Sequence, residues 1–232
     1  MLGLFEKKEK LRIDPKTPIA SARFTVIDTE LTGLDERKDS IVSFGAVRMT
    51  GSGIRLGETF YRVARPGAAL RPESVVIHEI TPTEAAAQPA APEVLEEFLR
   101  FCGDDVLVGH FLAIDLAFLG REMKLARRGA LRNPVVDTFS VYEWLRKRME
   151  VHPCLEPGAS RTRLYDIVKC FGIPVNGAHN ALLDAYTTAQ LFQRLLPLLT
   201  RAGAHTLGDV LSIGIPFEGG DRFGLTGEFT NF

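Results

Sequence analysis

The order of the apolar segments along this 232-residue chain is the feature that most constrains its fold. A run rich in Phe, Val and Ile at 23–28 is typical of a buried strand, and similar runs follow at 40–49 and 57–63. Thr-Gly-Ser-Gly at 50–53 lies between the last two runs, which predicts a hairpin. The first part of the chain is therefore expected to form a meander of strands.

After Pro72 the pattern becomes helical, and two further strand-like runs at 105–110 and 134–138 alternate with helical stretches. The helical patterns cover 92–102, 112–126, 139–149, roughly 162–171 and 179–200. Strands that come first as a meander and then alternate with helices predict an α/β domain, in which helices flank a mixed five-stranded sheet. Active sites in such domains collect beyond the carboxyl ends of the parallel strands.

Length and composition predict one main domain with extensions. With 45% hydrophobic and 25% charged residues the chain has ordinary globular proportions, which excludes a disordered or collagen-like protein. Residues 1–20, with Pro15 and Pro18, are expected to form an N-terminal arm, and 21–202 the main domain. Residues 203–232 are expected to be a C-terminal tail, whose Gly- and Phe-rich end is either docked by its phenylalanines or disordered.

Cysteine content and the N-terminus favour a cytoplasmic protein. Cys102, Cys154 and Cys170 are odd in number and have no C-x-x-C spacing, so neither a disulfide framework nor a zinc knuckle is expected. The N-terminal apolar stretch is too short for a signal peptide, and even the apolar run at 112–120 carries Asp115, so no membrane span is expected. The formal net charge of −1 gives no global argument for a nucleic-acid partner.

Asp28 and Glu30 end the first predicted strand, and the two-residue period of a strand puts both carboxylates on one face. Close, partly buried like charges repel unless a cation neutralises them. Two solvated acids at a strand end are an equally good explanation of this pair alone.

Two later positions carry acids of the same kind. Asp115 is a single acid in an apolar helix, where it needs a partner or a metal, although a favourable interaction with the helix dipole would also explain it. His179 and Asp184 are five residues apart, so on one helix their side chains would diverge. They can serve one site only if His179 lies on the loop before the helix, where it could act as a general base.

Taken together, these four acids and one histidine lie at the ends of three predicted elements. Carboxylates suit Mg²⁺ or Mn²⁺ as ligands, and two such ions can activate a water and stabilise the leaving oxygen of a phosphodiester. Four carboxylates nearly balance the charge of two divalent ions, so the combined pattern predicts a two-metal site.

The segments FTVIDTELTGL, LVGHFLAID and HNALLDA resemble the three exonuclease motifs of the DEDD superfamily, in its histidine-containing (DEDDh, DnaQ-like) branch. Segments 76–81 and 135–138 extend the resemblance, which covers roughly 22–200. The resemblance implies a ribonuclease-H-like fold for the exonuclease domain 21–202. It also implies 3′–5′ hydrolysis of nucleic acid to nucleoside 5′-monophosphates with two Mg²⁺ or Mn²⁺ ions.

The resemblance also implies residue roles. Asp28, Glu30, Asp115 and Asp184 would be metal ligands, and His179 would take the proton from the attacking water. The positions that resemble substrate contacts are Thr29, Leu31, Thr32, His110 and Phe111. His78 and Asp137 match positions expected to be mainly structural or to support the metal ligands from behind. Family members often have Asn where Phe111 stands and commonly Thr where Leu31 stands, so the contacts to the terminal nucleotide are expected to differ here.

Single-stranded or frayed DNA is the expected substrate. An exoribonuclease acting on RNA or oligoribonucleotides, and a non-catalytic nucleic-acid-binding module, are the alternatives. The stretch 121–170 is locally basic and could follow a phosphate backbone, or it could be a solvated helix surface. The segment 193–198 (QRLLPL) resembles a sliding-clamp-binding peptide of the replication machinery, but its apolar spacing favours core packing.

Overall fold

The computed structural model describes residues 13–149, 152–156, 163–175 and 177–216. Most of the predicted arm and the Phe-rich end of the predicted tail lie outside these residues. The strands are β1 (Arg23–Leu31), β2 (Ile41–Thr50), β3 (Gly53–Val63), β4 (Val106–Gly109) and β5 (Val135–Asp137). They form one sheet in the order β3-β2-β1-β4-β5.

The sheet is mixed. β2 pairs antiparallel with both β1 and β3, which confirms the predicted hairpin, while β4 pairs parallel with β1 and β5. The carboxyl ends of the three parallel strands β1, β4 and β5 therefore meet at one edge of the sheet. The predicted five-stranded mixed sheet with flanking helices is confirmed.

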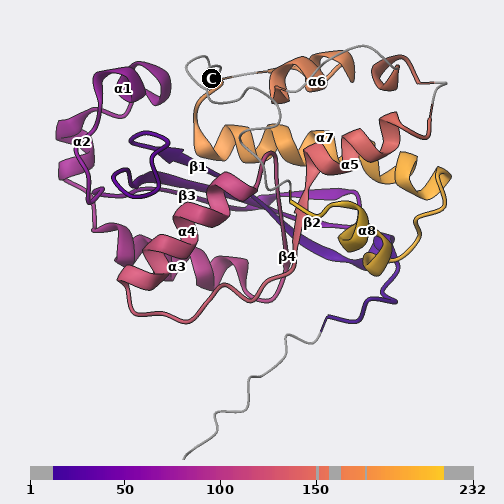
Figure 1. The fold of residues 1–232 in the computed structure, drawn as a ribbon, viewed down its shortest axis with the longest axis horizontal. Helices are drawn as coiled ribbons and strands as arrows, with labels where there is room; N and C mark the ends of the chain where they lie inside the picture. Colours follow the sequence, from indigo (N-terminus) through magenta and orange to yellow (C-terminus); the bar gives the residue numbers. More distant parts are fainter. Residues whose placement is uncertain (1–12, 150–151, 157–162, 176, 217–232) are drawn as a thin grey trace, which may run out of the picture.

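The helices are α1 (Pro72–His78), α2 (Pro82–Ala86), α3 (Ala91–Cys102), α4 (Ala113–Leu125), α5 (Thr138–Arg146), α6 (Leu164–Cys170), α7 (Ala181–Arg201) and α8 (Leu207–Ile213), with short turns η1 (Ile19–Ser21) and η2 (Pro153–Leu155). α3 and α4 lie on one side of the sheet, and α6 and α7 on the other (Figure 1). In the described part of the chain, no helix combines the length and the apolar character needed to cross a membrane.

The alternation of side chains along the strands builds a core on each side of the sheet. Phe24 and Val26 of β1 pack with α5, α6, α7 and α8, whereas Ile27, one residue on, packs with α3 and α4. Phe24 meets Phe192 of α7 edge to face, with ring centroids 5.1 Å apart. The sheet is thus buried on both faces, so its carboxyl edge is the part of it left to build a site.

Helix α8 was not predicted; the sequence analysis placed it in the C-terminal tail. Its start is fixed by a capping box between Thr206 and Asp209, and Leu207 is buried in the α7-side core. The backbone N–H of Leu207 donates to the carbonyl of Thr17, so this segment lies against the described end of the arm. A seven-residue helix is too short for periodicity to reveal, and the capping pair was the available signal.

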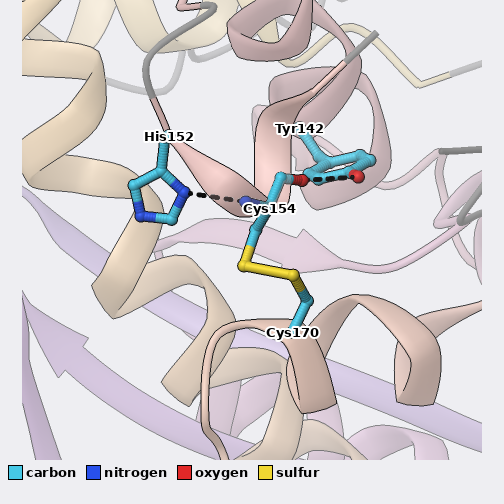
Figure 2. Close-up of a disulfide and its surroundings, with 4 residues drawn as sticks. All are labelled: Tyr142, His152, Cys154 and Cys170. Carbon is cyan, nitrogen blue, oxygen red and sulfur yellow. Dashed lines mark hydrogen bonds between the residues drawn. A yellow bond between two sulfur atoms is a disulfide. The ribbon is translucent and has the colours of Figure 1, made fainter. Parts of the chain in front are cut away.

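The expectation of no disulfide is wrong. Cys154 of η2 and Cys170 of α6 form a disulfide (Figure 2), with Cα atoms 5.5 Å apart. Cys102 is a free, buried thiol. Spacing could not reveal this pair, because the tertiary packing of η2 against α6 brings the sulfurs together. The bond ties the end of α6 to a segment 16 residues earlier in the chain.

Reduction of this disulfide should lower the free energy of unfolding by ~3 kcal/mol, because a cross-link of this loop length restricts the unfolded chain by about that amount. For a chain of this size that corresponds to a fall of ~6–12 °C in the unfolding midpoint. Thermal melts with and without a thiol reductant measure this fall in the midpoint. The Cys154→Ala/Cys170→Ala variant is the control, since its midpoint should not respond to reductant. An equal response of variant and parent would contradict the prediction.

Candidate active site

The carboxyl end of β1 sends its side chains to the two sides of the sheet in turn. Phe24 and Val26 face the side covered by α7, so the period of the strand directs Asp28 and Glu30 to that side. Thr29 lies between them and is directed to the side of α4. One short stretch of strand can therefore reach both α7 and α4.

The start of α7 packs directly on β2 beside Asp28. Gly45 is the β2 partner of Asp28 in the sheet, and a Cβ atom added to Gly45 would collide with the backbone carbonyl of Ala181, the first residue of α7. Only a glycine allows this approach. The contact places Asp184, in the first turn of α7, over the end of β1.

Three of the predicted acids converge. Asp28, Glu30 and Asp184 each offer a carboxylate oxygen, and these atoms all lie within 4.8 Å of one another. Asp184 is buried, with 6% of its surface exposed, and Asp28 is partly buried. A strand end and a helix start that are more than 150 residues apart in the sequence thus form one acidic pocket.

Asp115 of α4 is not one of these three converging acids, but its charge acts on Asp28 and Glu30. It lies in the first turn of α4, is 7% exposed, and accepts a hydrogen bond of 2.7 Å from the hydroxyl of Thr29. Asp137 fixes the start of this segment, because its carboxylate accepts from the backbone N–H groups of Leu112 and Phe139. Asp137 therefore links β5 to α4 and α5, which is the structural role expected for it.

His179 lies on the loop before α7, as a shared site requires. It adopts a left-handed backbone conformation (φ 64°), and Asn180 caps the helix by accepting from two backbone N–H groups. The N–H of His179 donates to Asp184 at 2.9 Å and to the hydroxyl of Tyr165 at 3.3 Å. These bonds hold a conformation that is uncommon for a residue other than glycine.

Burial raises the pKa values of all four acids, and repulsion within the group adds to the rise for two of them. Desolvation is the largest cause in each case. The charges of Asp184 and Asp115 add to the rise for Asp28 and Glu30, so the pKa of Asp28 lies well above its usual value and that of Glu30 rises to about 8. The pKa rises to about 7 for Asp115 and to about 6 for Asp184.

These residues fit a pair of hard divalent cations. The donors are carboxylate oxygens, which Mg²⁺ and Mn²⁺ prefer, and three of them lie close enough together to contact one ion. Each raised pKa reports an unfavourable ionised form that a cation would stabilise. Burial lowers the pKa of His179, so its imidazole is neutral at pH 7 and able to accept a proton.

Without metal, the protein should become less stable as the pH rises. The folded state holds a proton on Glu30 up to about pH 8, whereas the unfolded chain releases it near pH 4. Between these values the folded state binds more protons than the unfolded state, so the free energy of unfolding falls with rising pH. In the presence of a chelator, thermal melts at pH 6 and pH 8.5 should differ by ~5 °C, with the lower midpoint at pH 8.5.

Two controls accompany these melts. Glu30→Gln removes the titrating group, so the difference between the two pH values should shrink in this variant. Added Mn²⁺ binds the deprotonated acids and should remove or reverse the difference in the parent protein. A midpoint that rises with pH in chelator would contradict the assignment of these shifts.

Gly45→Ala should separate α7 from β1. The added methyl group meets backbone that cannot move aside, and we expect a loss of ~2 kcal/mol in the free energy of unfolding together with a loss of divalent-cation binding. Chemical denaturation and calorimetric Mn²⁺ titration measure the two effects. Gly57→Ala on β3 is the matched control, because nothing lies within 4 Å of a Cβ there. Equal behaviour of both variants would be inconsistent with this role of Gly45.

Leu31 and Thr32, two of the predicted substrate contacts, lie at the end of β1 in surroundings that differ from each other. Leu31 is partly buried against the α3 and α4 side of the core. Thr32 has no exposed surface; its hydroxyl donates to Asp39 at 3.2 Å and accepts from the backbone N–H of Ser40 at 3.0 Å. These bonds give Thr32 a role in bracing the loop, and a contact between Thr32 and a nucleotide stays a prediction.

His110 and Phe111 lie at the end of β4, on the same edge of the sheet as the acids. Nδ1 of His110 lies 2.9 Å from the hydroxyl of Thr138, and the two aromatic rings meet edge to face. Phe111 has a positive φ of 52° and packs its ring against Phe139. Both residues are partly exposed, so each retains surface for a ligand.

Tyr165 is a site residue that sequence analysis missed. Its hydroxyl donates to Asp184 at 2.8 Å, and its ring lies edge-on to the imidazole of His179. Burial and the charge of Asp184 raise the pKa of this hydroxyl, so it stays protonated. No signal in the sequence separates Tyr165 from the other residues of its helix, because its role depends on how α6 packs against α7.

The segment 193–198 lies inside α7, and Leu195, Leu196 and Leu198 are buried in the core. Core packing, which its spacing favoured, is therefore confirmed. Basic side chains of the stretch 121–170 also pair within the protein: Arg128 with Glu96, and Arg146 with Glu143. Arg161 lies outside the described residues.

Fold and site together define a ribonuclease-H-like α/β protein with carboxylates gathered at the carboxyl edge of its sheet. A family model described as "Exonuclease" matches residues 25–192. The chain belongs to this exonuclease family, which confirms the expectation of an exonuclease.

Similar proteins include "DNA polymerase III subunit epsilon" of Aquifex aeolicus, which is 36% identical over 173 residues, covering 75% of this chain and 80% of that protein. The protein of the same name from Treponema pallidum is 31% identical, covering 82% of this chain and 83% of its own length. A "DNA polymerase III subunit epsilon-like protein" of Rhodobacter capsulatus is 35% identical over 85% of this chain but only 27% of its own length.

Solved structures support the fold. E. coli exonuclease I, solved with a dT13 oligonucleotide, superposes with a TM-score of 0.67 at 21% identity, over 78% of this chain and 42% of that one. Exonuclease X, solved with 5′ overhanging duplex DNA, gives 0.59 at 20% identity, over 83% of this chain and 99% of that one. At these identities the likeness concerns the fold alone.

Proposed function

We propose that this protein is a metal-dependent 3′–5′ exonuclease that acts on single-stranded or frayed DNA and releases nucleoside 5′-monophosphates. The observation that carries the proposal is the convergence of Asp28, Glu30 and Asp184, with carboxylate oxygens within 4.8 Å of one another, beside the buried Asp115. Such a group of acids repels itself unless cations are bound, and the family to which the chain belongs is one of exonucleases.

Asp28, Glu30, Asp115 and Asp184 are the proposed ligands of two Mg²⁺ or Mn²⁺ ions. When bound, such a pair supplies an activated water and charge stabilisation for the leaving oxygen of a phosphodiester. Thr29 holds the Asp115 carboxylate in place through its hydroxyl.

His179 is the proposed base that takes the proton from the attacking water. Its lowered pKa keeps the imidazole neutral at pH 7, and the hydrogen bonds of its backbone N–H fix the loop that carries it. The proposed contacts to the terminal nucleotide are Thr29, Leu31, Thr32, His110 and Phe111.

The proposed DNA substrate is supported by the names of similar proteins. Two of the relatives are named as subunits of DNA polymerase III, and the two exonucleases of similar fold were solved with DNA. The same names suggest a polymerase partner. The leucines of segment 193–198 are buried in the core, which argues against this segment as the contact for such a partner.

Asp28→Ala and Asp184→Ala should each lower exonuclease activity by more than ~10³-fold while the protein remains folded, because each removes a ligand of the proposed ions. Gel analysis of single-stranded DNA labelled at the 5′ end should show stepwise shortening by the parent protein. The same DNA labelled at the 3′ end should release a labelled mononucleotide at once. Asp104→Asn is the control, since Asp104 is an exposed acid on the turn before β4.

The same assay separates the alternatives. Faster digestion of an RNA strand of matched sequence would favour an exoribonuclease. Release of label from the 5′ end first would overturn the proposed direction. Binding of DNA without any cleavage in Mg²⁺ or Mn²⁺ would favour a non-catalytic nucleic-acid-binding module.

A further inference from the structure

Tyr165 connects two functional groups of the candidate site from a helix that carries none of the predicted ligands. Its hydroxyl lies 2.8 Å from Oδ1 of Asp184 and 3.3 Å from the backbone nitrogen of His179. Tyr165 itself is partly buried in the first turn of α6. It therefore touches both the proposed ligand and the loop of the proposed base.

The direction of each hydrogen bond is fixed by the groups involved. A tyrosine hydroxyl has one hydrogen to donate, and an ionised carboxylate can only accept, so the hydroxyl donates to Asp184. The peptide N–H of His179 can only donate, so it donates to the hydroxyl oxygen and to Oδ2 of Asp184. The three groups form a closed triangle in which every donor has an acceptor.

This triangle constrains the two groups in different ways. Within the triangle, each oxygen of the Asp184 carboxylate accepts a hydrogen bond, which fixes the orientation of the carboxylate. The backbone of His179 is held in its left-handed conformation, and its imidazole packs edge-on against the Tyr165 ring with centroids 5.7 Å apart. Loss of the hydroxyl removes one corner of the triangle and leaves the ring contact intact.

The helix that presents Tyr165 is itself firmly anchored. Ile167 and Val168 of α6 are fully buried in the α7-side core, and Cys170 at its end is bonded to Cys154 of η2. α6 is therefore held both by the core that it shares with α7 and, through the disulfide, by η2, so Tyr165 is presented from a fixed support.

We propose that Tyr165 is a positioning residue, whose hydroxyl orients the Asp184 carboxylate for metal binding and holds the His179 loop for proton transfer. The roles in metal binding and proton transfer rest on the proposed function, whereas the hold on the conformation of the His179 loop does not. Tyr165 acts through these two residues and makes no contact of its own with the reacting atoms.

The test is Tyr165→Phe, which removes only the hydroxyl. Calorimetric titration with Mn²⁺ should show a dissociation constant ~10-fold higher than in the parent, the range found when a partner of a metal ligand is removed. With single-stranded DNA, kcat should fall ~10-fold and KM should change less than twofold, because the hydroxyl positions groups for the reaction rather than binding substrate. In the metal-free protein, the NMR signals of the His179 imidazole should shift.

Tyr142→Phe is the matched control. The hydroxyl of Tyr142 is fully buried and donates to the backbone carbonyl of Cys154 at 2.9 Å (Figure 2). Its removal should lower the free energy of unfolding about as much as Tyr165→Phe does. It should leave the Mn²⁺ affinity, kcat and the NMR signals of His179 unchanged. A merely structural role for Tyr165 predicts the same behaviour for both variants.

The outcomes separate the two proposals. If the parent binds Mn²⁺ and cleaves DNA while Tyr165→Phe matches it within twofold in Mn²⁺ affinity and kcat, the positioning role is overturned and the exonuclease stands. If the parent binds no Mn²⁺, the proposed function fails with the metal part of this inference. A shift of the His179 signals in metal-free Tyr165→Phe would then still support the loop part, and unchanged signals would overturn it.

Discussion

Repulsion among carboxylates is the interaction that the surrounding structure has to overcome. Asp28, Glu30 and Asp184 bring their oxygens within 4.8 Å of one another in a place with little access to water, and the charge of Asp115 acts on two of them. Nothing in the group itself favours this arrangement in the absence of cations. The acids are held together because each is attached to an element whose own packing is favourable.

Three features supply that attachment. Gly45 allows the start of α7 to rest on the β2 backbone, so Asp184 is placed by a contact between main chains. Asp137 ties the start of α4 to β5, which places Asp115. The parallel pairing of β1, β4 and β5 aligns their carboxyl ends and brings these contacts to one edge of the sheet.

Much of this arrangement is predictable from local patterns. The period of β1 placed Asp28 and Glu30 on one face, and the five-residue offset between His179 and Asp184 required a loop position for the histidine, which the structure shows. Tyr165 and the Cys154–Cys170 bond could not be predicted in this way. Both depend on the packing of α6 against α7 and η2, and no periodicity or spacing along the chain carries that information. The short helix α8 was missed because seven residues hold too little of a period.

The hydrogen bonds also grade the acids by proton affinity. Glu30, whose pKa is raised by burial and by two neighbouring charges, keeps its proton up to about pH 8. The hydrogen bond from Thr29 opposes the rise in the pKa of Asp115, which reaches about 7. The hydrogen bonds from Tyr165 and His179 oppose the rise in the pKa of Asp184, which reaches about 6. Glu30 therefore holds its proton more tightly than Asp184 does, because hydrogen bonds from neighbouring residues offset the effect of burial at Asp184. Asp184 remains ionised at neutral pH because Tyr165 and the His179 loop stabilise its charge, so the same contacts that orient this carboxylate also keep it available as a ligand.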